Sequence, residues 1–297
     1  MLGIGSLAQS NLPFAQSFHP VSERSGEAGN RKIKKRTLMK EVNPTESIRA
    51  FETWMNAPKA SNKKRIVVFT GAGVSADSGI ATFRDADGLW ANYRIEEVCT
   101  PEALSINRNK VIEFYNTRRQ ESLTKKPNDG HIAIAQLEQW ADVCVITQNV
   151  DNLHEQAGST RVLHLHGELM KLRSEKNPTL IYQIQEWEQS LDARAKDGAL
   201  LRPHIVFFGE DVPMFQLASK IVEQADILII VGTSLAIYPA ASLVYYMRDE
   251  NVPIYLVDPG TPDTSIISNP LTHIKERGAV GVPILVEQLR KLLYQTV

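Results

Sequence analysis

The chain has 297 residues, of which 43% are hydrophobic and 23% charged, and its formal net charge is -1. This composition is typical of a globular protein with an ample core, and the charge excludes an overall attraction to nucleic acid or to an anionic membrane. Because two cysteines cannot form a disulfide framework and no apolar run approaches the ~20 residues that span a bilayer, we expect a soluble protein of the reducing cytoplasm.

Residues 1–45 differ in composition from the rest of the chain. Their first part is small and polar, and their second part is rich in charge with little periodicity. Such a segment cannot bury enough apolar surface to fold alone, so we expect a disordered N-terminal extension before a folded domain at residues 46–297. A basic cluster at residues 31–36 is compatible with a nucleic-acid or targeting patch, although a solvated tail is the simpler interpretation.

An apolar run ends in a glycine-rich turn within residues 65–90. The run Ile66–Phe69 predicts a strand buried on both faces, and Gly71 and Gly73 allow a tight turn whose N–H groups could meet a diphosphate. The dinucleotide fingerprint G-x-G-x-x-G is incomplete, because Val74–Ala76 stand where its third glycine is expected. Spacing alone therefore leaves nucleotide binding and a ligand-free turn equally open.

Apolar spacing predicts helices on both sides of this strand. Residues 46–55 and 282–293 each carry an amphipathic pattern. Thr100 is a suitable N-cap for a helix that starts at Pro101, and a second helix follows over residues 111–123. We expect the helix that starts at Pro101 and the helix over residues 111–123 to lie outside the sheet in a small lid domain.

Polar residues follow the later apolar runs where each run ends. Residues 143–146, 162–165, 227–231 and 254–257 each predict a strand. Because ligands of open α/β sheets bind along the carboxyl edge, the residues after these strands are expected to converge on one crevice. They are Gln148, Asn149, Val150, Asp151, His166, Gly232, Thr233, Ser234 and Asp258.

Several segments, in order along the chain, resemble the motifs of the sirtuins, the NAD-dependent protein lysine deacylases. The resemblance covers roughly residues 62–295. Within the family, the chain is similar to the bacterial class III-like (CobB-like) branch. The segments are GAGVSADSGIATFRDADGLW from Gly71, TQNVDNLHEQAG from Thr147, LHLHGEL from Leu163, RPHIVFFGE from Arg202 and VGTSLAIYPA from Val231.

The resemblance implies an α/β fold: a Rossmann-like, doubly wound parallel sheet with a small, mostly helical inserted domain. The expected core spans residues 62–90, 130–170 and 202–297. The small domain is expected at residues 91–129 and 171–201.

The resemblance also implies NAD as cofactor and assigns residues to it. An aspartate at position 258, where the family often has asparagine, would repel a 2′-phosphate and favour NAD over NADP. Without the resemblance, neither the Gly232-Thr233-Ser234 turn nor Arg84 in its glycine-rich loop would be evidence of cofactor binding. The implied cofactor residues are Gly71, Ala72, Gly73, Ala76, Ile80, Phe83, Arg84, Trp90, Gln148, Asn149, Val150, Asp151, Gly232, Thr233, Ser234, Asp258, Pro259, Gly260, Gly278 and Ala279.

His166 resembles the catalytic histidine of the family, with Asn149 and Asp151 beside it. In sirtuins the acyl-lysine oxygen attacks C1′ of the nicotinamide ribose, nicotinamide leaves, and the histidine acts as general base on the ribose hydroxyls. The products are the deacylated lysine and O-acyl-ADP-ribose. Without the resemblance, a histidine at a strand end is more often structural, and Asp151 also suits the start of a helix.

Two further segments resemble the substrate site. Val206, Phe207, Phe208, Gly209 and Glu210 resemble the segment that pairs with the substrate peptide, although an ordinary edge strand is the alternative. Tyr115 and Arg118 share a helix face and resemble the pair found in sirtuins that accept succinyl- and malonyl-lysine.

The chain departs from the family at the zinc site. Most sirtuins hold zinc with two C-x-x-C pairs, but no cysteine lies between His166 and Arg202. We therefore predict no metal, with apolar residues at helical spacing over residues 181–191 packing in its place.

These features favour an NAD-dependent deacylase acting on acetyl-, succinyl- and malonyl-lysine proteins, without sequence-specific nucleic-acid binding or a membrane partner. An ADP-ribosyltransferase or NAD hydrolase is the enzymatic alternative, but it would not need an acyl-lysine tunnel. A non-catalytic NAD or ADP-ribose sensor is the third, and the intact Asn149, Asp151 and His166 argue against it.

Overall fold

The computed structural model describes residues 39–59, 63–82 and 93–294. The chain divides into two compact units, residues 1–36 and 37–297, and all described residues belong to the second. Among them, no helix is both long and apolar enough to cross a membrane.

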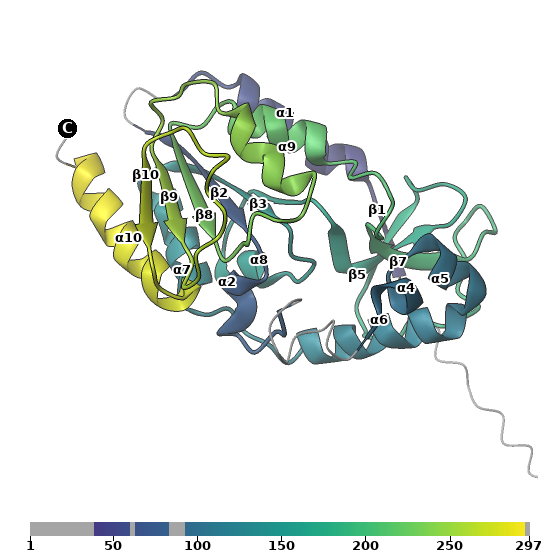
Figure 1. Cartoon of the computed structure of the whole chain (residues 1–297). Coiled ribbons are helices and arrows are strands. Elements are labelled where there is room, and N and C mark those ends of the chain that lie inside the picture. The colour runs from purple at the N-terminus through teal and green to yellow at the C-terminus, as the bar shows by residue number, and fades with distance from the viewer. Residues whose placement is uncertain (1–38, 60–62, 83–92, 295–297) are drawn as a thin grey trace, which may run out of the picture. The chain divides into compact units, whose positions relative to one another are not determined.

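The larger sheet has six parallel strands in the order β10-β9-β8-β2-β3-β4 (Figure 1). Because all six run the same way, their carboxyl ends share one edge. The predicted strands of the core are confirmed to within a residue or so. The bounds are β2 Arg65–Thr70, β3 Asp142–Thr147, β4 Val162–His164, β8 Ile227–Val231, β9 Ile254–Val257 and β10 Leu271–Ile274.

Helices cover both faces of this sheet, as the doubly wound prediction requires (Figure 1). One face packs against α7 and α10, and the other against α1, α9 and the 3-10 helix η2. The bounds are α1 Pro44–Asn56, α7 Asp129–Gln136, α9 Phe215–Val222, η2 Ala240–Tyr246 and α10 Gly278–Tyr294. Shorter elements are α2 Gly73–Ala76, η1 Leu137–Gln139 and α8 Leu153–Ala157.

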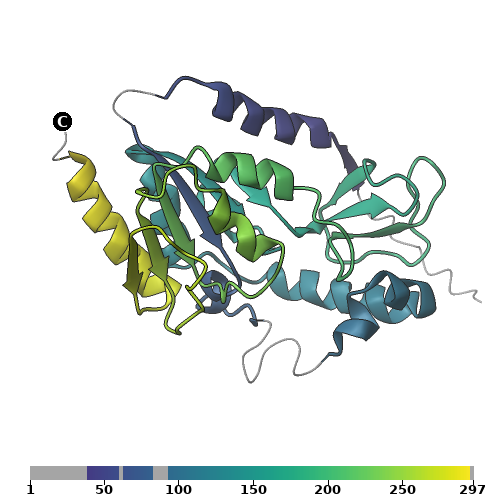
Figure 2. The same cartoon turned by 45° about the horizontal axis from the view of Figure 1, so that its top comes forward.

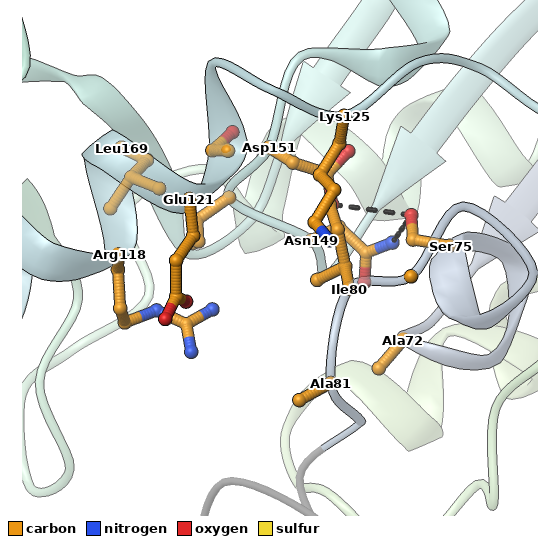
Figure 3. A pocket seen from close by; sticks show the side chains of 13 residues that line it. Ala72, Ser75, Ile80, Ala81, Arg118, Glu121, Lys125, Asn149, Asp151 and Leu169 are labelled. Atoms are coloured by element: carbon orange, nitrogen blue, oxygen red, sulfur yellow. Dashed lines mark hydrogen bonds between the residues drawn. The ribbon is translucent and has the colours of Figure 1, made fainter.

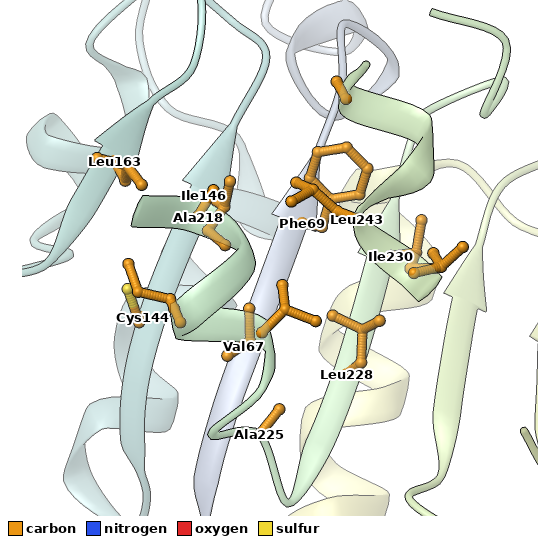
Figure 4. Close-up of a cluster of buried hydrophobic side chains, with 14 of the residues drawn as sticks. Val67, Phe69, Cys144, Ile146, Leu163, Ala218, Ala225, Leu228, Ile230 and Leu243 are labelled. Atoms are coloured by element: carbon orange, nitrogen blue, oxygen red, sulfur yellow. The ribbon is translucent and has the colours of Figure 1, made fainter. Parts of the chain in front are cut away.

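Strand β2 lies in the centre of the sheet and contributes to both cores. Ile66 and Val68 belong to the cluster with α7 and α10, whereas Val67 and Phe69 belong to the cluster with α1 and α9. Figure 4 shows the second cluster, in which Phe69 packs beside Leu243. Burial on both faces explains why the strand reads as a continuous apolar run.

A second sheet has four antiparallel strands in the order β1-β6-β5-β7, which Figure 2 shows beside three helices. Its strands are β1 Met39–Val42, β5 Gly167–Ser174, β6 Ile181–Ile184 and β7 Leu201–Ile205. The helices are α4 Ile95–Val98, α5 Pro101–Ile106 and α6 Arg108–Ser122. As predicted, Thr100 caps α5 by accepting the N–H of Ala103 at 3.0 Å.

The prediction of a mostly helical small domain is wrong for its second part. Residues 181–184 form β6, which pairs with β1 on one side and β5 on the other. Trp187 and Leu191, expected on the buried face of a helix, are 36% and 41% exposed. The apolar spacing also fits a strand, and two neighbouring strands satisfy its backbone groups, so tertiary pairing decided the outcome.

The predicted domain boundaries also need correction. Strand β1 lies inside the segment 1–45 that was expected to be disordered, because β6 offers an edge on which it pairs. The expected limits at residues 170 and 202 fall within β5 and β7, which are continuous strands of the small sheet.

Candidate active site

The turns after β2 and β8 touch each other through glycines. A Cβ at Gly71 would lie 2.7 Å from the Gly232 oxygen, and a Cβ at Gly232 would lie 2.4 Å from the nitrogen of Val74. Gly232 also has a φ of +59°, which disfavours other residues. These glycines are therefore required by the close approach of two backbone turns.

The N–H groups of the first turn are mostly engaged within the protein. Gly71 and Gly73 donate to the carbonyls of Val231 and Gly232 at 3.0 and 2.9 Å. The N–H groups of Val74 and Ser75 donate back to the carbonyls of residues 71 and 72. These four donors are therefore engaged within the protein, and the binding of a diphosphate at this turn stays a prediction.

A cavity of about 290 Å³ lies at the carboxyl edge of the larger sheet, covered by α6 (Figure 3). Several of its lining residues were predicted: Ala72, Ile80, Arg118, Asn149, Val150 and Asp151. Others were not: Ser75, Gly79, Ala81, Glu121, Ser122, Lys125 and Leu169. The cavity thus brings together side chains from the glycine turn, the loop after β3, and α6.

Asn149, Asp151 and Ser75 form one buried hydrogen-bonded group in this cavity, drawn with dashed lines in Figure 3. The Asn149 amide donates to the Gly71 carbonyl and to Ser75 Oγ, both at 3.1 Å. Ser75 Oγ donates to Asp151 Oδ2 at 3.2 Å, and the other carboxylate oxygen accepts the N–H of Leu153 at the start of α8. Burial raises the pKa of Asp151, although these hydrogen bonds oppose the shift.

His131, which sequence reasoning missed, extends this group. Its Nδ1 accepts the N–H of Asn128 in the capping box of α7, so the neutral ring carries its proton on Nε2, 3.3 Å from Ser75 Oγ. Burial lowers the pKa of His131 to about 4, which keeps the ring neutral. A helix-start pattern at Asn128 was the only sequence signal for it.

His166 follows β4 and is oriented by the loop after β3. Its Nδ1 lies 3.1 Å from the carbonyl oxygen of Gln148. A carbonyl can only accept, so Nδ1 carries the proton and the neutral ring keeps its lone pair on Nε2. Burial lowers the pKa of His166, despite the hydrogen bond to Gln148. The ring is thus held as a base at neutral pH.

The remaining predicted cofactor residues lie near the same edge but outside the cavity. The Gln148 amide donates to Thr233 Oγ1 at 2.9 Å, which joins the ends of β3 and β8. Gly278 packs at the start of α10 against Val74. Ala76 and Ser234 are exposed, as are Pro259 and Gly260, while Asp258 Oδ1 accepts the N–H of Gly260 and Ala279 lies one residue into α10. Phe83, Arg84 and Trp90 lie outside the described residues.

Tyr115 and Arg118 behave differently from each other. Arg118 lines the cavity, and burial lowers its pKa. Tyr115 does not line it: its hydroxyl donates to Cys99 Sγ at 3.2 Å, and its ring stacks on Phe207 at 5.8 Å between centroids. In this arrangement only Arg118, and not Tyr115, is placed to bond an acyl carboxylate in the cavity.

Residues 206–210 follow β7 as irregular backbone with a turn at residues 208–209, and do not form the expected strand. The N–H groups of Val206 and Phe208 donate to the carbonyls of His166 and Cys99. Glu210 accepts the N–H of Phe207 and ion-pairs with Arg202 and Arg173, at 2.6 and 3.1 Å. Its carboxylate holds the turn in shape, and its direct contact with substrate stays a prediction.

Within the part of the chain that the structure describes, no three His, Cys, Asp or Glu side chains gather to hold a metal ion. Ser174, which stands near the position of the first family cysteine, instead donates to Asp197 and accepts the N–H groups of Lys176 and Asn177.

Comparison with known proteins matches residues 71–239 to the Sir2 family. The NAD-dependent protein deacylase of Bacteroides thetaiotaomicron is 48% identical over 235 residues, which cover 77% of this chain and 98% of that protein. The Helicobacter pylori protein of the same name is 50% identical, covering 69% of this chain and 89% of its own length. The chain belongs to the Sir2 family.

Solved structures agree with this assignment. A Sir2 homologue in complex with NAD is 36% identical, with a TM-score of 0.69 over 82% of this chain and 94% of that one. A Sir2 homologue variant bound to ADP-ribose is 37% identical, with a TM-score of 0.71 over 83% and 97% of the two chains.

Proposed function

We propose that this chain is an NAD-dependent protein lysine deacylase that releases nicotinamide and O-acyl-ADP-ribose. The observation that carries the proposal is the cavity in which Asn149, Asp151 and Ser75 form one hydrogen-bonded group, together with the His166 ring, which the Gln148 carbonyl of the same loop holds with its lone pair on Nε2. Both curated relatives described above are named NAD-dependent protein deacylases.

The residues of the cavity fit the nicotinamide riboside part of NAD. Ala72 and Ile80 give apolar walls, while Asn149 and Asp151 supply an amide and a carboxylate that can bond a carboxamide and sugar hydroxyls. NAD would supply the ribosyl–nicotinamide bond that is broken. His166 takes a hydroxyl proton on Nε2, and its Nδ1–H stays on the Gln148 carbonyl throughout.

Replacing the base tests this proposal. We expect His166→Ala to lower kcat for deacylation of an acetyl-lysine peptide by ~100-fold or more, the scale of general-base catalysis. The measurement is nicotinamide release with saturating NAD, with the thermal midpoint as a control for folding. A folded variant with wild-type kcat would refute the assignment of His166.

We also propose that the enzyme accepts acidic acyl groups, with Arg118 holding the acyl carboxylate. Arg118 lines the cavity near Asp151, and a guanidinium can hold a carboxylate through parallel hydrogen bonds. Tyr115 would add a donor only if its hydroxyl left Cys99. The acyl-lysine peptide itself is proposed to lie along residues 206–208.

Matched acyl peptides test the acidic-acyl proposal. We expect Arg118→Met to lower kcat/KM for succinyl-lysine about 10- to 100-fold, as losing a charged hydrogen bond predicts, and to leave acetyl-lysine within a few-fold. Lys126→Met removes an exposed positive charge nearby and serves as the control. An equal loss on both peptides would show that Arg118 does not read the acyl carboxylate.

The proposal includes a zinc-free small domain and a cytoplasmic location. A buried apolar cluster, drawn from three strands of the small sheet and from the segment before β7, can replace a metal clamp; its members are Leu172, Tyr182, Ile184, Ala195 and Leu201. Cys99 and Cys144 are both buried and free, as suits a reducing compartment.

A further inference from the structure

His164, two residues before the proposed base, is held at both ring nitrogens by oxygen atoms. Nδ1 lies 2.8 Å from the carbonyl oxygen of Asn149, and Nε2 lies 2.8 Å from Oε1 of Glu155 in α8. His164 is 8% exposed. A carbonyl and a carboxylate can only accept, so both nitrogens must donate, and the ring is an imidazolium.

The surrounding charges support this protonation state. Burial lowers the pKa of His164, but the hydrogen bond to Glu155 and the charges of Glu168 and Glu155 outweigh it and raise the pKa to about 9. Glu155 lies on α8, Glu168 on β5, and Asp151 in the loop after β3, so carboxylates face the ring from three elements. His154, also on α8, stays neutral because burial lowers its pKa well below the ordinary value.

The two histidines hold adjacent peptide groups of the same loop. His166 donates to the carbonyl of Gln148, and His164 donates to the carbonyl of Asn149. The Asn149 side chain in turn bonds Gly71 and Ser75. Fixing the backbone carbonyl of Asn149 therefore fixes the direction in which the side-chain amide of Asn149 enters the cavity.

We propose that His164, held as a cation by Glu155, is a positioning residue that fixes the Asn149 peptide and so the amide of Asn149 within the cavity. The inference rests on the proposed function of that cavity. It predicts that the bond from Nδ1, rather than the ion pair with Glu155, carries the effect on catalysis, because only the former reaches the loop.

Two substitutions separate these bonds. An asparagine amide can occupy the place of the histidine Nδ1 and a glutamine amide the place of Nε2, so His164→Asn keeps a donor toward Asn149, and His164→Gln keeps a donor toward Glu155. We expect His164→Asn to retain kcat within about 3-fold and His164→Gln to lose kcat on the order of 10- to 100-fold, as misplacement of a reacting group predicts. Thermal midpoints of both variants control for folding.

The proposal would be overturned if each variant lost kcat in proportion to its drop in thermal midpoint, or if His164→Asn lost more kcat than His164→Gln. Either result would leave a purely structural ion pair. An inactive wild-type protein would instead refute the proposed function. The positioning contact is then judged by NMR of the wild-type ring at pH 8, where an ordinary histidine is neutral. Protons on both nitrogens of His164 are expected, and a single proton would overturn the inference whether or not the variants fold.

Discussion

His131, His164 and His166 differ in protonation because their partners differ. His131 and His166 each have one nitrogen fixed by a backbone group and are desolvated, so burial lowers both pKa values. His164 faces two acceptors, and its pKa is raised to about 9. His164 and His166, two residues apart after the apolar run of β4, therefore carry different charges: His166 is neutral and can accept a proton, whereas His164 is a cation that donates to the loop after β3.

The lowered pKa of His166 makes a prediction about pH dependence. In the proposed mechanism the neutral ring is the base, so a pKa below the ordinary 6.5 keeps the base available as the pH falls. We expect the acid limb of kcat/KM for an acyl-lysine peptide to have its midpoint below pH 6.5. A midpoint at or above 6.5, measured on protein that remains folded across the range, would contradict the burial of this base.

Some site residues were visible in the sequence and others were not. Asn149, Asp151 and His166 could be placed at the sheet edge because they lie within four residues of the ends of β3 and β4, but only the family resemblance gave them catalytic roles. Ser75 and His131 could not, because a serine in a short helix and a histidine near a helix start have ordinary local roles. Their partnership, at 3.3 Å, depends on α2 and α7 meeting across the end of β2.

At the scale of elements, the contact between the β2 and β8 turns makes a testable claim about two glycines. Gly232 and Gly198 both have positive φ, but only Gly232 is crowded, whereas a Cβ at Gly198 meets nothing within 4 Å. We expect Gly198→Ala to lower the free energy of unfolding by about 1 kcal/mol and Gly232→Ala by about 3 kcal/mol or more. Urea unfolding measures both, and equal losses would contradict the close packing of the two turns.

The core elements were predictable because fully buried parallel strands read as continuous apolar runs. Strands β8 and β9 have the predicted bounds. The small sheet was missed because β1 and β6 are short, and their pairing joins residues that lie far apart in the chain. The local sequence pattern carries no information on such pairing. The spacing of apolar residues was therefore the only basis for predicting a helix over residues 181–191.

At the scale of the whole folded unit, the cavity depends on contributions from distant parts of the chain. The parallel sheet supplies the glycine turn and the loop after β3, and α6, which lies beside the small sheet in Figure 1, supplies Arg118. This division separates the proposed roles, because we propose that the loop after β3 binds the cofactor and that α6 selects the acyl group. A change in acyl preference should therefore be possible without loss of NAD-dependent chemistry.

The most direct test of the account is the stoichiometry of the reaction. Purified protein, NAD and a succinyl-lysine peptide are incubated with and without a metal chelator, and nicotinamide, free lysine peptide and O-succinyl-ADP-ribose are quantified by mass spectrometry. We predict equal amounts of all three products, unchanged by the chelator, and no nicotinamide when the peptide is omitted. Nicotinamide released without peptide, or activity lost with the chelator, would contradict a zinc-free NAD-dependent deacylase.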